Sequence, residues 1–255
     1  MSKTGGLSDK NKKILVPLAN GFEEIEFVSI VDTLRRAGVE VVIAGVNGSN
    51  EVGVKKDLRA SGNSTRIYTG AHGVEICAEV SLEGLDSSAL ARFDGVALAG
   101  GWQGMLNLKS SQKLREILRD FKARGKLVSA ICASPIVLDS AGVLAGKFAC
   151  YPSCEAFTEE SASDNADKNA ESSTDKNNNK ARQTPQPKPL NGEYEPNASV
   201  VRNGNLITAA GPATGILFAL EIISYLLGQA KSNEIAEQML VPYLKSNAKI
   251  VRDKI

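Results

Sequence analysis

The residues best suited to chemistry in this sequence lie at three points where a predicted strand ends. These are the run Glu23-Glu24-x-Glu26, the pair Gly100-Gly101, and the segment 130–135, which contains Cys132. In open α/β sheets, ligands bind outside the carboxyl ends of the strands, so residues at these three points can share one site. A cysteine, a carboxyl group and backbone amides together suit nucleophilic attack on a carbonyl carbon.

Cys132 has a strand pattern before it and a helix pattern after it. Residues 127–131 are mostly apolar, and Pro135 suits a first helical turn, where a missing N–H has no cost. A thiolate at a helix N-terminus meets unpaired N–H groups and the positive end of the helix dipole, which lower the thiol pKa. The dipole contributes roughly one pKa unit, so a thiolate at neutral pH needs a further donor.

Glu26 is the candidate for that donor. An ionised glutamate would repel a thiolate, whereas a buried protonated one would donate a hydrogen bond to it and have a raised pKa itself. Gly100 and Gly101 would let the backbone approach the sulfur, and the N–H groups of Gly101 and Ala133 could form an oxyanion hole.

Structural interpretations of the same residues remain open. A cysteine after a buried strand is often a small core residue, Gly-Gly is often a plain turn, and glutamates at a helix start often only compensate the dipole. Cys150 and Cys154 lack the spacing and the histidine partners of a common zinc site, so packing is favoured and no metal is expected. His72, the single histidine, is expected in an exposed or interfacial turn.

The elements that must position these residues follow the alternation of an α/β domain. Residues 14–19 and 39–46 are apolar strands around a helix, which makes a βαβ unit and hence a parallel sheet. The helix carries apolar residues at spacings near 3.6, namely Ile25, Val28, Val31 and Leu34. Further strands are predicted at 66–69, 74–79, 95–99, 127–131, 148–151, 199–202 and 206–210, and further helices at 111–124, 133–141, 214–227 and about 233–245.

Two segments are predicted to lie outside the packed fold. Residues 1–12 are expected to be a flexible tail before one domain that spans residues 13–255. Within that domain, residues 158–197 are rich in polar and charged residues, and Leu190 is their single aliphatic residue larger than alanine. Such a segment cannot bury enough apolar surface to offset the entropy of ordering, so we predict a disordered, low-complexity insertion.

The composition excludes several classes of protein. The 30 basic residues nearly cancel the 29 acidic ones, so neither nucleic acid nor an anionic membrane is an expected partner. No stretch approaches the ~20 apolar residues that cross a bilayer, and the first residues lack the apolar core of a secretory signal. Four cysteines are few for a disulfide framework, so we expect reduced thiols and a cytoplasmic location.

Six short motifs occur in a fixed order along residues 13–244. They are Ile14-Leu15-Val16, Gly21-Phe22-Glu23-Glu24-Ile25-Glu26, Leu34-Arg35-Arg36-Ala37-Gly38, Ala99-Gly100-Gly101, Ala130-Ile131-Cys132-Ala133-Ser134-Pro135 and Gly211-Pro212-Ala213-Thr214. In these motifs the sequence resembles the DJ-one branch of the ThiJ/PfpI superfamily. The resemblance excludes the 158–197 segment and the loop at 47–65.

The resemblance implies a flavodoxin-like three-layer sandwich with a mostly parallel central sheet, a cysteine at a nucleophile elbow, and a homodimer. It implies that Cys132 is the nucleophile, that Glu26 is its proton-sharing partner, and that the backbone of Gly101 and Ala133 binds an oxyanion. No cofactor is implied. Gly100, Tyr151 and His72 are auxiliary candidates, the last of which would approach from a partner subunit.

The implied activity is a cofactor-independent glyoxalase or deglycase. Its substrates would be methylglyoxal-type 2-oxoaldehydes or their early glycation adducts on protein or nucleotide, in carbonyl and oxidative stress defence. The alternative is a redox-sensing stress protein or chaperone whose Cys132 is oxidised to sulfinate, with little turnover. Two departures bear on turnover, because Tyr151 stands where many relatives have histidine and Ala210 where some have arginine.

Overall fold

The computed structural model of the chain describes residues 12–46, 55–56, 66–157, 189–243 and 250–252. The strands are β1 (Lys13–Leu18), β2 (Glu40–Gly45), β3 (Lys55–Lys56), β4 (Arg66–Thr69), β5 (Glu75–Cys77), β6 (Val80–Ser81), β7 (Gly95–Leu98), β8 (Leu127–Ile131), β9 (Lys147–Phe148), β10 (Glu193–Tyr194), β11 (Val200–Asn203), β12 (Leu206–Ala209) and β13 (Ile250–Arg252). The α-helices are α1 (Glu24–Arg36), α2 (Ser87–Ala91), α3 (Trp102–Ser110), α4 (Gln112–Ala123), α5 (Pro135–Ser140), α7 (Gly215–Leu227) and α8 (Gln229–Gln238).

Eight strands form the central sheet, in the order β13-β11-β12-β8-β7-β1-β2-β6. Neighbouring strands run parallel, apart from the antiparallel pair β11–β12, which is joined by a turn at Gly204 and Asn205. All residues of β7 and β8 are buried. Continuous apolar strands of this kind require cover on both faces of the sheet, which explains the layered architecture.

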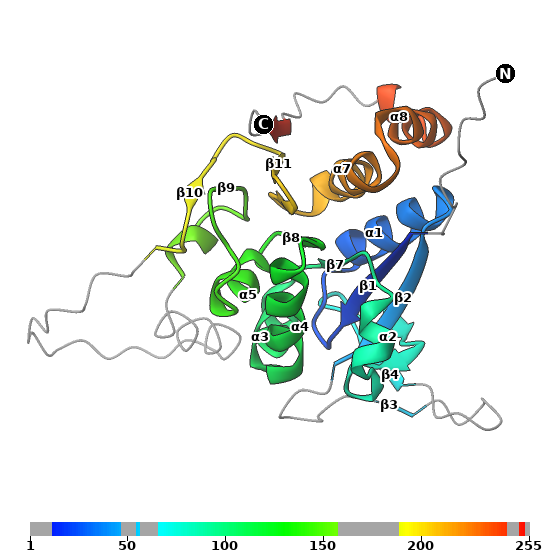
Figure 1. Ribbon diagram of the computed structural model, residues 1–255, viewed down its shortest axis with the longest axis vertical. Helices are drawn as coiled ribbons and strands as arrows, with labels where there is room; N and C mark the ends of the chain where they lie inside the picture. Colours follow the sequence, from blue (N-terminus) through cyan, green and yellow to red (C-terminus); the bar gives the residue numbers. More distant parts are fainter. Residues whose placement is uncertain (1–11, 47–54, 57–65, 158–188, 244–249, 253–255) are drawn as a thin grey trace, which may run out of the picture.

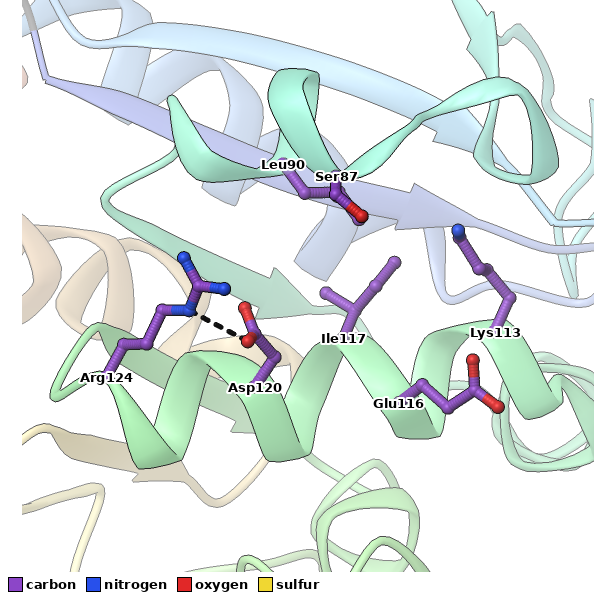
Figure 2. Close-up of a pocket in the computed structure, with 7 residues that line it drawn as sticks. All are labelled: Ser87, Leu90, Lys113, Glu116, Ile117, Asp120 and Arg124. Carbon is purple, nitrogen blue, oxygen red and sulfur yellow. Dashed lines mark hydrogen bonds and ion pairs between the residues drawn. The ribbon is translucent and has the colours of Figure 1, made fainter.

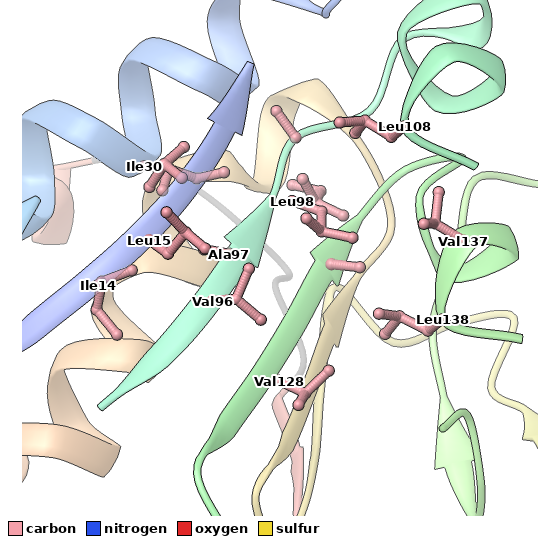
Figure 3. Packing of buried hydrophobic residues seen from close by; sticks show 14 of the residues in the cluster. Ile14, Leu15, Ile30, Val96, Ala97, Leu98, Leu108, Val128, Val137 and Leu138 are labelled. Carbon is pink, nitrogen blue, oxygen red and sulfur yellow. The ribbon is translucent and has the colours of Figure 1, made fainter. Parts of the chain in front are cut away.

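Helices cover both faces of the sheet (Figure 1). Helices α1 and α7 pack together over one face, and α3, α4 and α5 lie over the other. Figure 3 shows Ile30 of α1 against the sheet on one side, and Leu108 of α3 with Val137 and Leu138 of α5 on the other side. The predicted α/β class, a flavodoxin-like three-layer sandwich with a mostly parallel central sheet, is confirmed.

Helix α3 was not expected from the sequence. It begins directly after Gly101, and its interior contains Gly104, a residue that disfavours helix by about 1 kcal/mol relative to alanine. A Cβ atom at Gly104 would lie 2.8 Å from the carbonyl oxygen of Gly21. The glycine is therefore needed for close packing against the loop that precedes α1, and this packing outweighs the local preference.

The predicted apolar face of α1 is partly wrong. Ile25 and Val28 are 60% and 49% exposed, whereas Phe27, Ile30 and Leu34 are buried. The buried face of α1 is therefore rotated from the predicted face, so that Phe27 is buried in place of Val28. Its first turn is occupied by glutamates that face the interior, a role that hydrophobic periodicity alone does not reveal.

The ends of two other helices also differ from prediction. The last helix was predicted at about 233–245, but α8 starts at Gln229, because Gly228 with φ +91° reverses the chain immediately after α7. Helix α5 starts two residues later than predicted, after a turn at 132–134. Within the described residues, no helix is both long enough and apolar enough to cross a bilayer.

The end of the predicted insertion is also wrong. Residues 158–188 lie outside the described residues, as do residues 1–11, but residues 189–197 belong to the packed structure. Leu190 is buried, and its N–H donates to the carbonyl of Glu155 at 2.9 Å. Strand β10 then pairs parallel with β9. The buried Leu190 and the backbone pairing hold residues 189–197 in the packed structure. The polar composition of the segment gave no sign of this contact.

Candidate active site

Cys132 occupies a sharp turn between β8 and α5. Its φ of +64° lies in the left-handed region that residues other than glycine rarely adopt. The backbone is held on both sides, since its N–H donates to the Ala209 carbonyl at 3.0 Å and its carbonyl accepts the Tyr151 N–H at 2.9 Å. A strained strand-to-helix turn that presents a nucleophile is a nucleophile elbow. The cysteine itself is 8% exposed.

Glu26 brings a carboxyl group to this elbow from the first turn of α1. The residue is 0% exposed, and its Oε2 accepts the Gly100 N–H at 2.7 Å. Its own N–H donates to Oε2 of Glu23, the N-cap of α1, at 2.7 Å, which holds the helix start in place. Oε1 is buried and has no hydrogen bond within the described part of the chain. Burial raises the pKa of Glu26 to about 7.

The Cys132 thiol and the Glu26 carboxyl lie within hydrogen-bonding reach of each other. Burial raises the pKa of Cys132, and the negative charge of Glu26 raises it further, while the N–H groups of Gly101 and Ala133 lower it. An ionised Glu26 thus opposes the thiolate as expected from the sequence, whereas the larger effect, burial of the thiol, was not expected. A proton on Glu26 removes that repulsion and supplies a donor to the sulfur, so the pair favours a single negative charge.

The two glycines after β7 are both required by close approach. A Cβ atom at Gly100 would lie 2.6 Å from Cβ of Cys132 and 2.8 Å from Oε2 of Glu26. Gly101 has φ +89°, and a Cβ atom there would collide with the backbone of Gly21. Their absent side chains allow the N–H of Gly101 to lie close to the sulfur.

The structure places Tyr151 beside Cys132 through its backbone. Its N–H is the donor to the Cys132 carbonyl, while its side chain is half exposed and its ring packs near Gly211. The contact shown at the elbow is thus an amide, and the ring lines the outside of the site.

His72 lies in the predicted exposed turn, between β4 and β5. Its Nδ1 is 2.9 Å from Oε2 of Glu24, and the Glu24 carboxylate also accepts the N–H groups of His72 and Val74. Glu24 raises the pKa of His72, and these hydrogen bonds lower the pKa of Glu24 although burial opposes them. Within one chain, His72 is thus held by Glu24.

Sequence reasoning missed two supports of the site. The buried Ser134 Oγ donates to the Ala99 carbonyl at 2.6 Å and ties the elbow to the end of β7. Trp102, the first residue of α3, packs edge-on against Phe157 with ring centroids 5.9 Å apart. The position of Trp102 directly after Gly101 was the available signal.

One group of side chains among the described residues could hold a metal ion, namely Glu23, Glu24 and His72, whose ligand atoms lie within 4.8 Å of one another. In this structure the carboxylate of Glu24 fastens the turn that contains His72, and Glu23 caps α1. These contacts give the group a structural role.

A separate hollow of about 200 Å³ lies between α2 and α4. Figure 2 shows its lining side chains, which include the ion pair between Arg124 and Asp120 at 2.8 Å. The lining residues are Ser87, Leu90, Lys113, Glu116, Ile117, Asp120 and Arg124. None of these seven belongs to the segments that surround Cys132.

Comparison with known proteins agrees with this geometry. The sequence profile of the DJ-1/PfpI family matches residues 12–225. The chain belongs to the DJ-1/PfpI family. Among its DJ-1/PfpI relatives, Protein dj-1beta of Drosophila melanogaster is 34% identical over 235 residues, which cover 91% of this chain and 99% of that protein.

Two further DJ-1/PfpI comparisons concern structure and activity. The crystal structure of Drosophila melanogaster DJ-1beta superposes with a TM-score of 0.65 at 32% identity, covering 91% of this chain and 98% of that one. A Caenorhabditis elegans protein named glutathione-independent glyoxalase DJR-1.2 is 26% identical over 233 residues, which cover 91% of this chain and 97% of that protein.

The raised pKa of Glu26 predicts that the free energy of unfolding of this chain depends on pH. An acid whose pKa rises on folding contributes its full stabilisation below the unfolded value of 4.5, and the contribution is lost as pH rises through about 7. Urea unfolding of wild type and Glu26→Gln, measured from pH 4.5 to 8, should show the wild type losing about 3 kcal/mol relative to the variant. A difference that stays constant with pH would contradict the assignment.

Proposed function

We propose that this chain is a cysteine-dependent, cofactor-independent glyoxalase or deglycase that acts on methylglyoxal-type 2-oxoaldehydes or their early glycation adducts. The observation that carries the proposal is the Glu26 carboxyl, fully buried and within hydrogen-bonding reach of the elbow Cys132. Membership of the DJ-1/PfpI family supports it, as does the Caenorhabditis elegans relative named as a glutathione-independent glyoxalase. Carbonyl and oxidative stress defence in the cytoplasm is the role that follows.

The reaction starts with a proton transfer inside the pair. Glu26 has a pKa of about 7, so near neutral pH it can both accept the thiol proton and return it. Transfer of the thiol proton to Glu26 leaves a sulfur anion beside the N–H groups of Gly101 and Ala133. These donors stabilise the anion, and the proton on Glu26 removes the repulsion that opposes it.

The sulfur anion then attacks the aldehyde carbon of the 2-oxoaldehyde and forms a hemithioacetal. The negative charge that develops on the carbonyl oxygen lies within reach of the same backbone N–H groups. Glu26 moves a proton from the former aldehyde carbon to the neighbouring carbon, and this converts the adduct to a thioester. Water hydrolyses the thioester, releases the 2-hydroxy acid and restores the thiol.

Proton movement in this scheme depends on Glu26 alone or with water. The elbow contact of Tyr151 is its backbone N–H, and His72 is bound to Glu24 within its own chain. Oε1 of Glu26, which is buried without a hydrogen bond within the described residues, is the oxygen available to exchange a proton with substrate.

The activity assignment has a direct test. Lactate formation from methylglyoxal, without glutathione, should be abolished in Cys132→Ala and should fall about 10²–10⁴-fold in kcat in Glu26→Gln, since general acid–base catalysis contributes that much. Cys77→Ala is the matched control, because Cys77 is the exposed cysteine on β5 and should keep wild-type turnover. Activity that survives in Cys132→Ala would refute the assignment.

A second candidate is a redox-sensing stress protein whose Cys132 becomes a sulfinate. It is supported by the slight exposure of Cys132 and by Gly101, Ala133 and Glu26 around its sulfur, which could hold the two added oxygens. This candidate predicts that peroxide adds about 32 Da to wild type but not to Cys132→Ser, while wild-type lactate formation stays negligible. An unchanged wild-type mass would argue against it.

We also propose that the chain forms a homodimer through an apolar patch made of Ile25, Val28 and Val74. These side chains are 60%, 49% and 51% exposed. The N–H of Val74 reaches Oε1 of Glu24 at 3.4 Å, so the β4–β5 turn adjoins α1 and the three residues lie near one another. Burial of such a patch against a second copy would bring the partner's chain toward the turn that holds His72.

The proposed interface can be tested by placing one charged side chain in the patch. Val28→Lys should convert a dimer to a monomer in light scattering, because the ammonium would have to lose its water at the interface, while lysine itself favours the helix at this exposed position. Leu240→Lys is the control, since Leu240 is also exposed, at 60% against 49% for Val28, but follows α8. A wild-type protein that is already monomeric would overturn this interface.

A further inference from the structure

Two cysteines beside the elbow have no part in the proposed reaction. Cys150 and Cys154 follow β9, and both are buried and carry free thiols. They belong to the same core cluster as Cys132. Cys150 directly precedes Tyr151, whose N–H donates to the Cys132 carbonyl, so three of the four cysteines lie in two segments that meet at the elbow.

The turn that carries Cys154 is hydrogen-bonded onto the elbow. The Cys132 carbonyl accepts the N–H of Tyr151 at 2.9 Å, and the Tyr151 carbonyl accepts the N–H of Cys154 at 2.9 Å. Two successive hydrogen bonds therefore connect the backbone of Cys132 to that of Cys154. The outer side of this turn, Tyr151, Pro152 and Ser153, is exposed to solvent.

The two thiols of this segment have different surroundings. Cys150 Sγ is 3.9 Å from Oε2 of Glu155, which gives it a local carboxylate partner. Burial and the charges of Glu155 and Glu26 raise the pKa of Cys154, whereas the charges that act on Cys150 are those of Cys154 and Glu155. Cys154 thus shares with Cys132 the influence of one carboxyl group, that of Glu26.

We propose that Cys154 is a resolving thiol, which converts the sulfenic acid of peroxide-oxidised Cys132 into a Cys132–Cys154 disulfide. The proposal rests on Cys132 being the reactive thiol, as in the proposed function. It adds a reversible oxidation state to the site and assigns a chemical role to a residue that turnover does not need.

Disulfide formation takes two steps. The Cys132 thiolate attacks hydrogen peroxide, the O–O bond breaks, and the sulfur becomes a sulfenic acid while hydroxide leaves and is protonated to water. The Cys154 sulfur then attacks the sulfenic sulfur, the S–S bond forms and the S–O bond breaks. The departing oxygen takes the Cys154 proton and leaves as water, with Glu26 placed to relay that proton.

The disulfide requires the turn to close on the elbow, because the Cα atoms of a disulfide lie within ~7 Å of each other. Ser153, the residue before Cys154, has φ +77°, a conformation that is unfavourable for serine. A rearrangement of this turn would release the unfavourable conformation of Ser153. Disulfide formation would compete with a second peroxide, and Cys132 would be spared from the irreversible sulfinate.

The test follows peroxide-treated wild type, Cys154→Ser and Cys150→Ser by intact mass and peptide mapping after alkylation. Wild type should lose about 2 Da, yield a linked peptide that contains Cys132 and Cys154, and regain its thiols with dithiothreitol. Cys154→Ser should gain about 32 Da as sulfinate, and dithiothreitol should not reverse this. Cys150→Ser, which removes an equally buried thiol of the same segment, should behave as wild type.

The outcomes separate the two proposals. Sulfinate in wild type at the same rate as in Cys154→Ser overturns the resolving role and leaves Cys132 as the reactive thiol. A disulfide between Cys150 and Cys154 also overturns it. If peroxide leaves Cys132 unmodified in every variant, the resolving role fails together with the assigned reactivity. Lactate formation by Cys154→Ser without peroxide should equal that of wild type, and a loss of more than about tenfold would show that the residue supports the fold or turnover instead.

Discussion

The contact between the buried Glu26 carboxyl and the Cys132 sulfur is the interaction on which the site depends. A carboxyl group without water must be neutral or must be compensated, and here a single backbone N–H, that of Gly100, serves its Oε2. The pKa of the carboxyl rises to about 7 for that reason. The surroundings that make ionisation costly also keep a proton next to the sulfur at neutral pH. In the proposed reaction, proton storage on Glu26 and activation of the Cys132 sulfur therefore have one physical cause.

Several features of the fold serve to hold that contact. Glu23 caps the N-terminus of α1 and thereby fixes the position from which Glu26 reaches the site. Gly100 leaves the space in which the carboxyl and the cysteine meet, and Ser134 ties the elbow to the end of β7. The left-handed backbone of Cys132 is retained because its N–H donates to the Ala209 carbonyl and its carbonyl accepts the Tyr151 N–H. Pairing with β12, through Ala209, thus helps to hold the strained turn in place.

The first turn of α1 carries buried residues on one side and an exposed residue on the other. Its inner side carries Glu24 and Glu26, which fasten the β4–β5 turn and enter the site, respectively. Its outer side carries Ile25, which stays exposed. Two residues of the proposed patch, Ile25 and Val28, therefore lie on the same helix as Glu26. A partner that covers the patch would act on the helix that positions Glu26, and the 151–154 turn contacts the elbow from the other side.

The sequence by itself determined the alternation of strands and helices, the parallel sheet and the strand-to-helix turn at Cys132, because these depend on local periodicity and on residues adjacent in the chain. It also pointed to Glu26 and Gly100-Gly101 through their positions at strand ends and through motifs shared with a family. Only the tertiary structure decided that Ile25 and Val28 face outward, that α3 tolerates Gly104, and that Leu190 orders the stretch before β11. It also decided the direction of the thiol pKa, since burial and the charge of Glu26 outweigh the amides while Glu26 is ionised. Each of these depends on desolvation and close packing between residues far apart in the chain, and no local pattern records those terms.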